Sequence, residues 1–198
     1  MPAMAPHPVT EYYIMPVSPF DLDNQLAYRR WAAAKRASHP THARDLVVNV
    51  GDPRTLSDAE VQALLQRCAG ANMAIYRSAV RVPDKDIPRL LGQQMGLFRL
   101  DGNWLADEDG ISQIAVAATA GDRTAFIPYT NRPIKWHTDG YYHPQSRQIR
   151  AMILHCVRAA SSGGENALMD HEMAYIAMRD ANPDWVRALM APDAMTIP

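Results

Sequence analysis

The sequence has few cysteines, almost no net charge and no long apolar run. Its 198 residues include only two cysteines, Cys68 and Cys156, and carry a formal net charge of −1 at pH 7. A near-neutral chain has no general attraction to nucleic acid or to anionic membranes. No apolar run approaches the roughly 20 residues that span a bilayer, and no secretory leader precedes the first charged residues. We therefore expect a soluble, cytoplasmic protein with reduced thiols and neither a nucleic-acid nor a membrane partner.

Two common classes of catalytic motif are also absent. Neither G-x-x-x-x-G-K-[ST] nor G-x-G-x-x-G occurs, so Gly163 and Gly164 are interpreted as a turn rather than as a phosphate loop. Ser161 and Ser162 lack the G-x-S-x-G elbow of serine hydrolases. The chain is 47% apolar, which is enough to bury the core of about one large domain.

The first 110 residues mix helical and strand patterns. Helices are predicted at 24–38, at 57–68 and from residue 86, and strands at 45–50 and 73–76. The second helix begins with a capping box from Ser57 to Glu60, and Cys68 lies on its apolar face, which favours packing over chemistry. Asp86 is expected to cap the third helix.

After Gly102 the chain changes to short apolar runs separated by turn residues, at 111–118, 125–129, 134–139, 149–157 and 166–169. Short strands at this spacing predict a β-sandwich or barrel. Two helices follow, capped by Asp170 and Asn182, and the residues from Met195 look like the start of another strand. We expect an α+β fold in which residues 1–110 decorate one domain and residues 111–198 begin its β core.

The run Trp136-His137-Thr138-Asp139-Gly140 contains an H-x-D pair. Side chains two apart on a strand point to the same face, so His137 and Asp139 can reach one metal ion together. An imidazole nitrogen and a carboxylate oxygen are two of the three protein ligands in the 2-His-1-carboxylate triad of non-haem iron. By itself the tripeptide is a short motif with many chance matches.

Its surroundings add specificity. Five short runs follow one another along this part of the chain: Tyr129-Thr130-Asn131, the H-T-D run, Leu154-His155-Cys156, Gly163-Gly164-Glu165-Asn166 and Met169-Asp170. Their order and intervals resemble those of the taurine dioxygenase / γ-butyrobetaine hydroxylase (TauD/TfdA-like) superfamily. The resemblance implies a double-stranded β-helix (jelly-roll) core with a helical insert near the C-terminus. It also implies an Fe(II)- and 2-oxoglutarate-dependent dioxygenase that hydroxylates a small molecule with O2, giving succinate and CO2. The oligomeric state stays open, a homo-oligomer included.

Carried over by position, the resemblance makes His137 and Asp139 metal ligands and Asn166 a contact to 2-oxoglutarate. Asparagine replaces a threonine of taurine dioxygenase there, but both side chains form hydrogen bonds. Tyr129 and Asn131 become substrate contacts, because an aromatic face near this position can hold a cation. A packing role for Tyr129 remains the alternative.

The resemblance also implies a second histidine and an arginine further along the chain, and neither can be assigned. His155 lies in an apolar run and is interpreted as a hydrogen-bonded core histidine, and His171 follows a helix cap. The chain therefore looks C-terminally truncated, with a jelly roll that is incomplete and an activity that this chain alone lacks. Two alternatives stay open: a non-catalytic truncated or degenerate member, and a zinc hydrolase that uses His137, Asp139 and His143.

Overall fold

The computed structural model describes residues 18–102, 106–116 and 122–195. These residues divide into two compact units, each with its own buried apolar cluster. The first unit contains residues 18–41, 70–72 and 168–195. The second contains the described residues of 42–69 and 73–167. The sequence predicted a different division, with residues 1–110 as a decoration and residues 111–198 as the β core of one domain, and that division stays a prediction.

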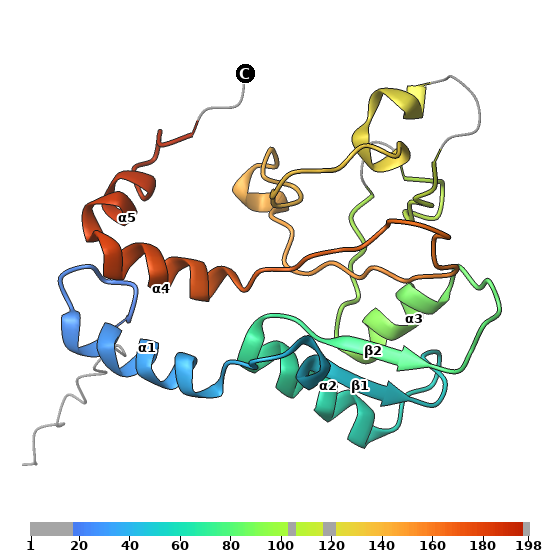
Figure 1. Ribbon diagram of the computed structural model, residues 1–198, viewed down its shortest axis with the longest axis horizontal. Coiled ribbons are helices and arrows are strands. Elements are labelled where there is room, and N and C mark those ends of the chain that lie inside the picture. The colour runs from blue at the N-terminus through green and yellow to red at the C-terminus, as the bar shows by residue number, and fades with distance from the viewer. Residues whose placement is uncertain (1–17, 103–105, 117–121, 196–198) are drawn as a thin grey trace, which may run out of the picture. The chain divides into compact units, whose positions relative to one another are not determined.

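Three helices form the first unit: α1 (Gln25–Ser38), α4 (His171–Ala181) and α5 (Pro183–Leu189). Helix α4 contacts both α1 and α5 (Figure 1). Tyr28 and Ala32 on α1 are buried against Ile176 on α4. Removing such apolar surface from water supplies most of the stability of a helix pair.

Each of these helices begins at a side-chain cap. Asn24 accepts a hydrogen bond from the backbone N–H of Ala27 at 3.0 Å, and Asp170 accepts one from Glu172 at 3.0 Å. Asn182 accepts one from Asp184 at 2.9 Å. Caps satisfy N–H groups that have no partner inside the helix, so the predicted starts of all three helices are confirmed.

The second unit opens with a β-α-β segment. It comprises η1 (Ala43–Leu46), β1 (Val47–Val50), α2 (Asp58–Ala71), β2 (Ile75–Ser78) and, after β2, α3 (Ile87–Gln94). The two strands pair in parallel, with Val47 opposite Ile75 and Val50 opposite Ser78. Parallel strands need a long crossover, and α2 supplies it. The last two residues of α2 belong to the first unit.

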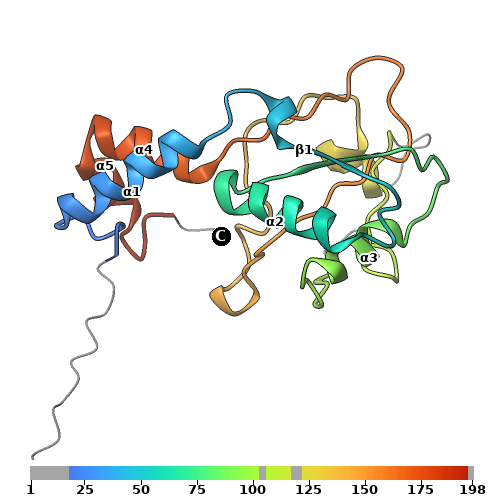
Figure 2. The same cartoon turned by 90° about the horizontal axis from the view of Figure 1, so that it is seen from below.

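The core of this unit lies between the strands and the helices. Val48 and Val50 of β1 are buried with Leu64 of α2 and Leu91 of α3. Figure 2 shows both helices on one side of the strands. The apolar spacing therefore predicted the buried residues Leu64 of α2 and Leu91 of α3, whereas Leu65, on the predicted face of α2, is 38% exposed.

The predicted cap of α3 is wrong in its detail. Asp86 precedes the helix, but its side chain makes no cap hydrogen bond, and its backbone is already helical at φ −76° and ψ −19°. A capping side chain needs an extended backbone at that residue. The Asp86 carboxylate instead pairs with Arg89 at 2.6 Å, and Asp84 accepts a hydrogen bond from the Asp86 N–H at 2.9 Å.

From residue 96 to residue 167 the described chain consists of turns, irregular segments and three 3₁₀ helices, which Figure 1 shows as loops and short coils. These are η2 (Asp122–Ala125), η3 (Ile127–Tyr129) and η4 (Gln145–Arg147). The strand predicted at 125–129 is wrong, since Pro128 lies in the first turn of η3.

The other predicted strands of this part have no ladder partner among the described residues. A strand is stable only when its backbone groups pair with a neighbour, so an apolar run alone does not produce one. Residues 117–118 and 196–198, where strand was also predicted, lie outside the described residues. The mixed α and β composition is confirmed, and the jelly roll stays a prediction.

Within this region, residues 152–156 nevertheless alternate between exposed and partly buried side chains, as in a strand. Ile153 and His155 are partly buried, and Ile153 packs against the β1 cluster. Met152 and Leu154 are 54% and 51% exposed. A period of two is the signature of a strand with two different faces.

Among the described residues, no helix is long and apolar enough to cross a membrane.

Candidate metal centre

His137 and Asp139 lie on an irregular segment that leads into a turn, not on a strand. The Nε2 atom of His137 is 4.0 Å from Oδ1 of Asp139, and the two side chains are 40% and 48% exposed. The Nδ1 atom of His137 lies 2.7 Å from the backbone carbonyl of Lys135. A carbonyl only accepts hydrogen bonds, so this contact puts the proton on Nδ1 and leaves the Nε2 lone pair directed away from it.

The two candidate ligand atoms are close, but not yet as close as two neighbouring ligands of one ion. Bonds from a divalent metal such as zinc to imidazole nitrogen or carboxylate oxygen are about 2.0–2.2 Å long. Two neighbouring ligands of one octahedral ion are therefore about 3 Å apart, so the 4.0 Å between Nε2 and Oδ1 has to shorten by about 1 Å before one ion binds both atoms. The hydrogen bond from Nδ1 to Lys135 fixes the tautomer that a metal-bound histidine needs. Sequence reasoning missed the carbonyl of Lys135, because a backbone acceptor leaves no signal in residue type.

Gly140 ends the segment with a turn that only glycine accommodates well. Its φ is +67°, and its carbonyl accepts a hydrogen bond from the His143 N–H at 2.9 Å. A Cβ atom at this position would lie 2.5 Å from Cδ1 of Ile149. Both the backbone conformation and the close packing therefore exclude larger residues. The turn fixes the direction of the chain immediately after Asp139.

The other predicted contact residues lie on separate segments. Asn166 is exposed, and its side-chain amide donates to the Gly164 carbonyl at 3.2 Å. Gly163 and Gly164 have φ values of +70° and +80°, a backbone conformation that favours glycine, while the predicted turn at these residues stays a prediction. Tyr129, in η3, is 5% exposed, whereas Asn131 is exposed. The roles of Asn166, Tyr129 and Asn131 in binding stay predictions.

The structure brings together the pair but no third ligand. Within residues 18–102, 106–116 and 122–195, no three His, Cys, Asp or Glu side chains form a group that could hold a metal ion. The set His137, Asp139 and His143 is therefore not assembled as a three-ligand site. His171 is the first residue of α4.

His155 forms a pair with Tyr76 of β2. The Tyr76 hydroxyl is 2.5 Å from Nδ1 of His155, and the two rings are stacked with an interplanar angle of 6°. Burial lowers the pKa of His155, against a smaller opposing effect of Asp84, which favours the neutral ring in this hydrogen bond. Burial, with a contribution from Cys156, raises the pKa of Tyr76 to about 12. His155 is hydrogen-bonded, as interpreted, but it is only partly buried and lies outside the two buried apolar clusters.

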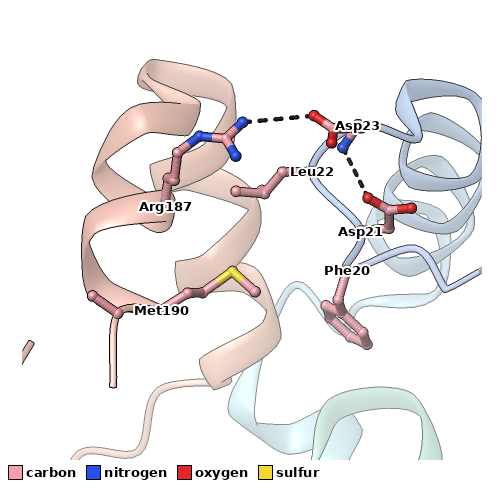
Figure 3. Close-up of a pocket in the computed structure, with 7 residues that line it drawn as sticks. Phe20, Asp21, Leu22, Asp23, Arg187 and Met190 are labelled. Carbon is pink, nitrogen blue, oxygen red and sulfur yellow. Dashed lines mark hydrogen bonds and ion pairs between the residues drawn. The ribbon is translucent and has the colours of Figure 1, made fainter. Parts of the chain in front are cut away.

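A shallow pocket of about 340 Å³ lies in the first unit, next to α5 (Figure 3). Arg187 and Asp23 face each other across it, with Nη2 and Oδ1 3.7 Å apart. Phe20, Leu22 and Met190 line its apolar part. Both charged side chains are largely exposed, and none of the predicted site residues lines it, so this pocket does not bear on the metal pair.

Comparison with known proteins identifies the class. Residues 35–197 match the family described as "Taurine catabolism dioxygenase TauD, TfdA family". The uridine-5'-phosphate dioxygenase of Amycolatopsis sp is 37% identical to this chain over 60 residues. That match covers 30% of this chain and 22% of the relative, so the similar part spans about a fifth of the relative's length. No solved structure matches the chain.

The family match covers most of the chain, including His137 and Asp139, the described residues of the second unit and the part of the first unit from residue 35 on. The chain therefore belongs to the TauD/TfdA family of dioxygenases. The resemblance inferred from the H-T-D, L-H-C and G-G-E-N runs is confirmed. It assigns the chain to a family of oxygenases.

Proposed function

We propose that this chain carries part of the iron centre of an Fe(II)- and 2-oxoglutarate-dependent dioxygenase that hydroxylates a small molecule. The observation that carries the proposal is the His137–Asp139 pair, with Nε2 and Oδ1 4.0 Å apart, inside a segment that belongs to a dioxygenase family. The proposal includes a jelly-roll core, which the family implies.

Each side chain has a defined task in this proposal. His137 offers the Nε2 lone pair, because Nδ1 donates to Lys135. Asp139 offers a carboxylate oxygen and its negative charge, and Asn166 offers an amide to the cosubstrate. Fe(II) with 2-oxoglutarate supplies, when bound, the oxidation of a C–H bond by O2 with release of succinate and CO2. The protein orients the reactants and keeps them at the metal.

The substrate is the finer part of the proposal. Tyr129 and Asn131 are proposed as substrate contacts from the resemblance. The relative from Amycolatopsis sp is named for uridine 5'-phosphate, which makes a nucleoside phosphate the first substrate to test. Trimethylammonium compounds form the second set, because a tyrosine face attracts cations. Sulfonates form the third set as the anionic contrast, because the same face repels anions.

The proposal is tested by titrating Fe(II) into the chain without oxygen, in the presence of 2-oxoglutarate, and measuring the heat of binding by calorimetry. With two assembled ligands, binding is expected to be weak, and His137→Ala and Asp139→Ala should each abolish it. His171→Ala is the matched control, since His171 is exposed on the other unit. Unchanged Fe(II) binding in both site variants, or equal loss in the control, would refute the proposed metal pair.

Turnover separates the remaining alternatives. Two ligands without a third histidine and an arginine lack both a metal bond and a bidentate clamp for the distal carboxylate of 2-oxoglutarate. Succinate formation by this chain alone is therefore expected to be undetectable. Robust succinate production would contradict the incomplete site, and hydrolysis of a test ester without O2 or 2-oxoglutarate would favour the zinc hydrolase.

A further inference from the structure

Helix α1 has an exposed face on the side opposite to the one that it buries. Tyr28 and Ala32 pack against α4. With 3.6 residues per turn, the residues two positions before and after Tyr28 lie on the opposite side of the helix. Those residues are Leu26, which is 62% exposed, and Arg30, which is also exposed. Ala33 continues the exposed face, and its small side chain leaves room for a second helix to approach.

An acidic corner of the same unit lies before the start of α1. Asp21 and Asp23 precede the helix, and Asp184 is in the first turn of α5. Arg187 approaches two of these carboxylates, with Nη2 3.7 Å from Oδ1 of Asp23 (Figure 3) and Nε 3.9 Å from Oδ1 of Asp184. Charge-assisted hydrogen bonds are about 2.7–2.9 Å long, so these are loose ion pairs. The Asp23 side chain is 89% exposed and can therefore accept a second cation.

The charges along this face are arranged about Leu26. Arg30 lies four residues after Leu26, which is about 6 Å along the helix axis. Arg29 is exposed beside it. Asp23 lies three residues before Leu26, at the other end of the face. The face thus carries a carboxylate, a leucine and a guanidinium in this order, and such a pattern is complementary to a copy of itself that runs in the opposite direction.

We propose that this face binds a second copy of the chain, with α1 of the two copies antiparallel across a two-fold axis that passes beside Leu26. Leu26 then packs on Leu26 of the other copy. Arg30 of each copy pairs with Asp23 of the other, because a two-fold contact forms every pair twice. The proposal concerns the first unit alone and does not depend on the iron centre.

The pocket beside Asp23 supports this arrangement. Its volume is about 340 Å³, and Leu22 and Met190 are among the residues that line it. The aliphatic stem of an arginine can lie along apolar side chains while its guanidinium reaches a carboxylate at the rim. Arg30 of the second copy can therefore cover Leu22 and Met190 as it pairs with Asp23.

The dimer is expected to be weak. Interfaces that bury less than about 1,200 Å² in total belong to transient complexes, and a contact centred on two turns of one helix is of this kind. Charged pairs at its ends select the partner and the register more than they add affinity. We therefore expect association in the micromolar to millimolar range.

Sedimentation equilibrium of the whole chain over this concentration range tests the inference. A monomer–dimer equilibrium is expected at low ionic strength, with weaker association at high ionic strength, since the Debye length falls from about 30 Å at 0.01 M to about 3 Å at 1 M. A chain that stays monomeric at millimolar concentration and low salt would overturn the inference. Oligomers larger than a dimer would also overturn it, because a two-fold contact closes with two copies.

A charge exchange tests the proposed pairs. Arg30→Glu and Asp23→Lys each place like charges together at both ends of the contact, so each variant alone should dimerise at least about 10-fold more weakly than the parent chain. In an equimolar mixture of the two variants, opposite charges meet again at both ends. The mixture should therefore form heterodimers about as well as the parent forms homodimers. Two weakened variants that fail to associate with each other would refute the pairing.

Two further variants complete the test. Leu26→Ala should weaken the dimer, because it removes the apolar centre of the contact. Arg44→Glu is the matched control for Arg30→Glu, since Arg44 is exposed on the other unit. Each variant is first checked for an unchanged circular dichroism spectrum. A dimer that is insensitive to Arg30→Glu, or that is weakened equally by Arg44→Glu, would overturn the assignment of this face.

Discussion

The buried ion network around Lys35 gives the most demanding test of the described packing. Lys35 is 6% exposed on α1, and its Nζ lies 2.8 Å from Oδ2 of Asp170 and 2.6 Å from Oε2 of Glu172. It also donates to the Gly70 carbonyl at 2.8 Å. Asn72 donates to Asp170 and Glu172 at 2.8 and 2.9 Å. Lys35→Met removes the cation and keeps most of the apolar stem.

The magnitude follows from which carboxylate is left without compensation. The Asp170 side chain is 1% exposed, whereas that of Glu172 is 25% exposed and can regain water. Breaking a buried ion pair by removing one partner costs about 3–5 kcal/mol. Asn72 still donates to Asp170, and His39 Nε2 lies 3.6 Å away, so we expect the lower end, about 3 kcal/mol.

Arg36→Met is the matched control. Arg36 is the next residue on α1, and its ion pair with Asp180 is exposed, with side-chain exposures of 46% and 47%. Exposed pairs contribute about 0–1 kcal/mol. Urea unfolding, followed by far-ultraviolet circular dichroism, should therefore separate the two variants clearly. A Lys35→Met variant that loses no more free energy of unfolding than Arg36→Met would refute the network as drawn.

A second variant isolates the charge interaction. Asp170→Asn keeps a good helix cap while it removes the negative charge. If the ion pair is coupled, the double variant with Lys35→Met should lose less stability than the sum of the single variants, by about 0.5–3 kcal/mol. Simple additivity would show that Lys35 and Asp170 do not interact.

The pH dependence has a definite sign. Burial alone raises the pKa of Asp170 and of Glu172, but hydrogen bonds from Lys35 and Asn72 outweigh it, and both pKa values lie below their ordinary 3.8 and 4.5. Such carboxyls stabilise the folded state above their unfolded pKa values, and this contribution is lost as the pH falls through the folded pKa values. Parent stability should decline below about pH 4.5, and less steeply in Lys35→Met.

Two further predictions concern local backbone features. Gly140→Ala combines a φ of +67° with a Cβ contact of 2.5 Å to Ile149, so it should lower the free energy of unfolding in urea by about 2–4 kcal/mol. The control is Gly163→Ala, which has a φ of +70° but no atom within 4 Å of the new Cβ, and it should lower this free energy by about 1 kcal/mol. Equal losses would mean that Ile149 does not clash. Ser57→Ala removes the capping-box acceptor for the Glu60 N–H, 3.4 Å away, and should cost about 1 kcal/mol; an unchanged urea midpoint would contradict this cap.

The helices could be predicted because their signals are local. Ser57 accepts from the Glu60 N–H, and the Glu60 carboxylate accepts from the Ser57 N–H at 2.7 Å, so the capping box forms as its sequence indicates. Hydrogen bonds from the Ser57 and Gly51 backbone accordingly lower the pKa of Glu60. Asp86 shows the limit of such signals, because a capping residue type gives no cap when its backbone is already helical.

The strands after residue 102 could not be predicted in the same way. A strand depends on a partner that is distant in sequence, and the composition of one segment contains no information on that partner. Residues 152–156 show the difference, because Ile153 packs on the core and Met152 and Leu154 are exposed, yet this stretch pairs with no strand among the described residues. The apolar run predicted a strand, whereas the pairing that makes a strand required residues that the run does not name.

The candidate metal pair, His137 and Asp139, has a local part that the sequence can predict and a distant part that it cannot. The i, i+2 spacing was expected to align His137 and Asp139 on a strand, yet they lie 4.0 Å apart on an irregular segment. Their approach is local, since the Lys135 carbonyl orients the imidazole and the Gly140 turn ends the segment directly behind the aspartate. A third ligand has to come from a distant segment, and spacing within one segment cannot specify it. A short motif can therefore indicate two candidate ligands of such a site, while the site as a whole depends on the fold.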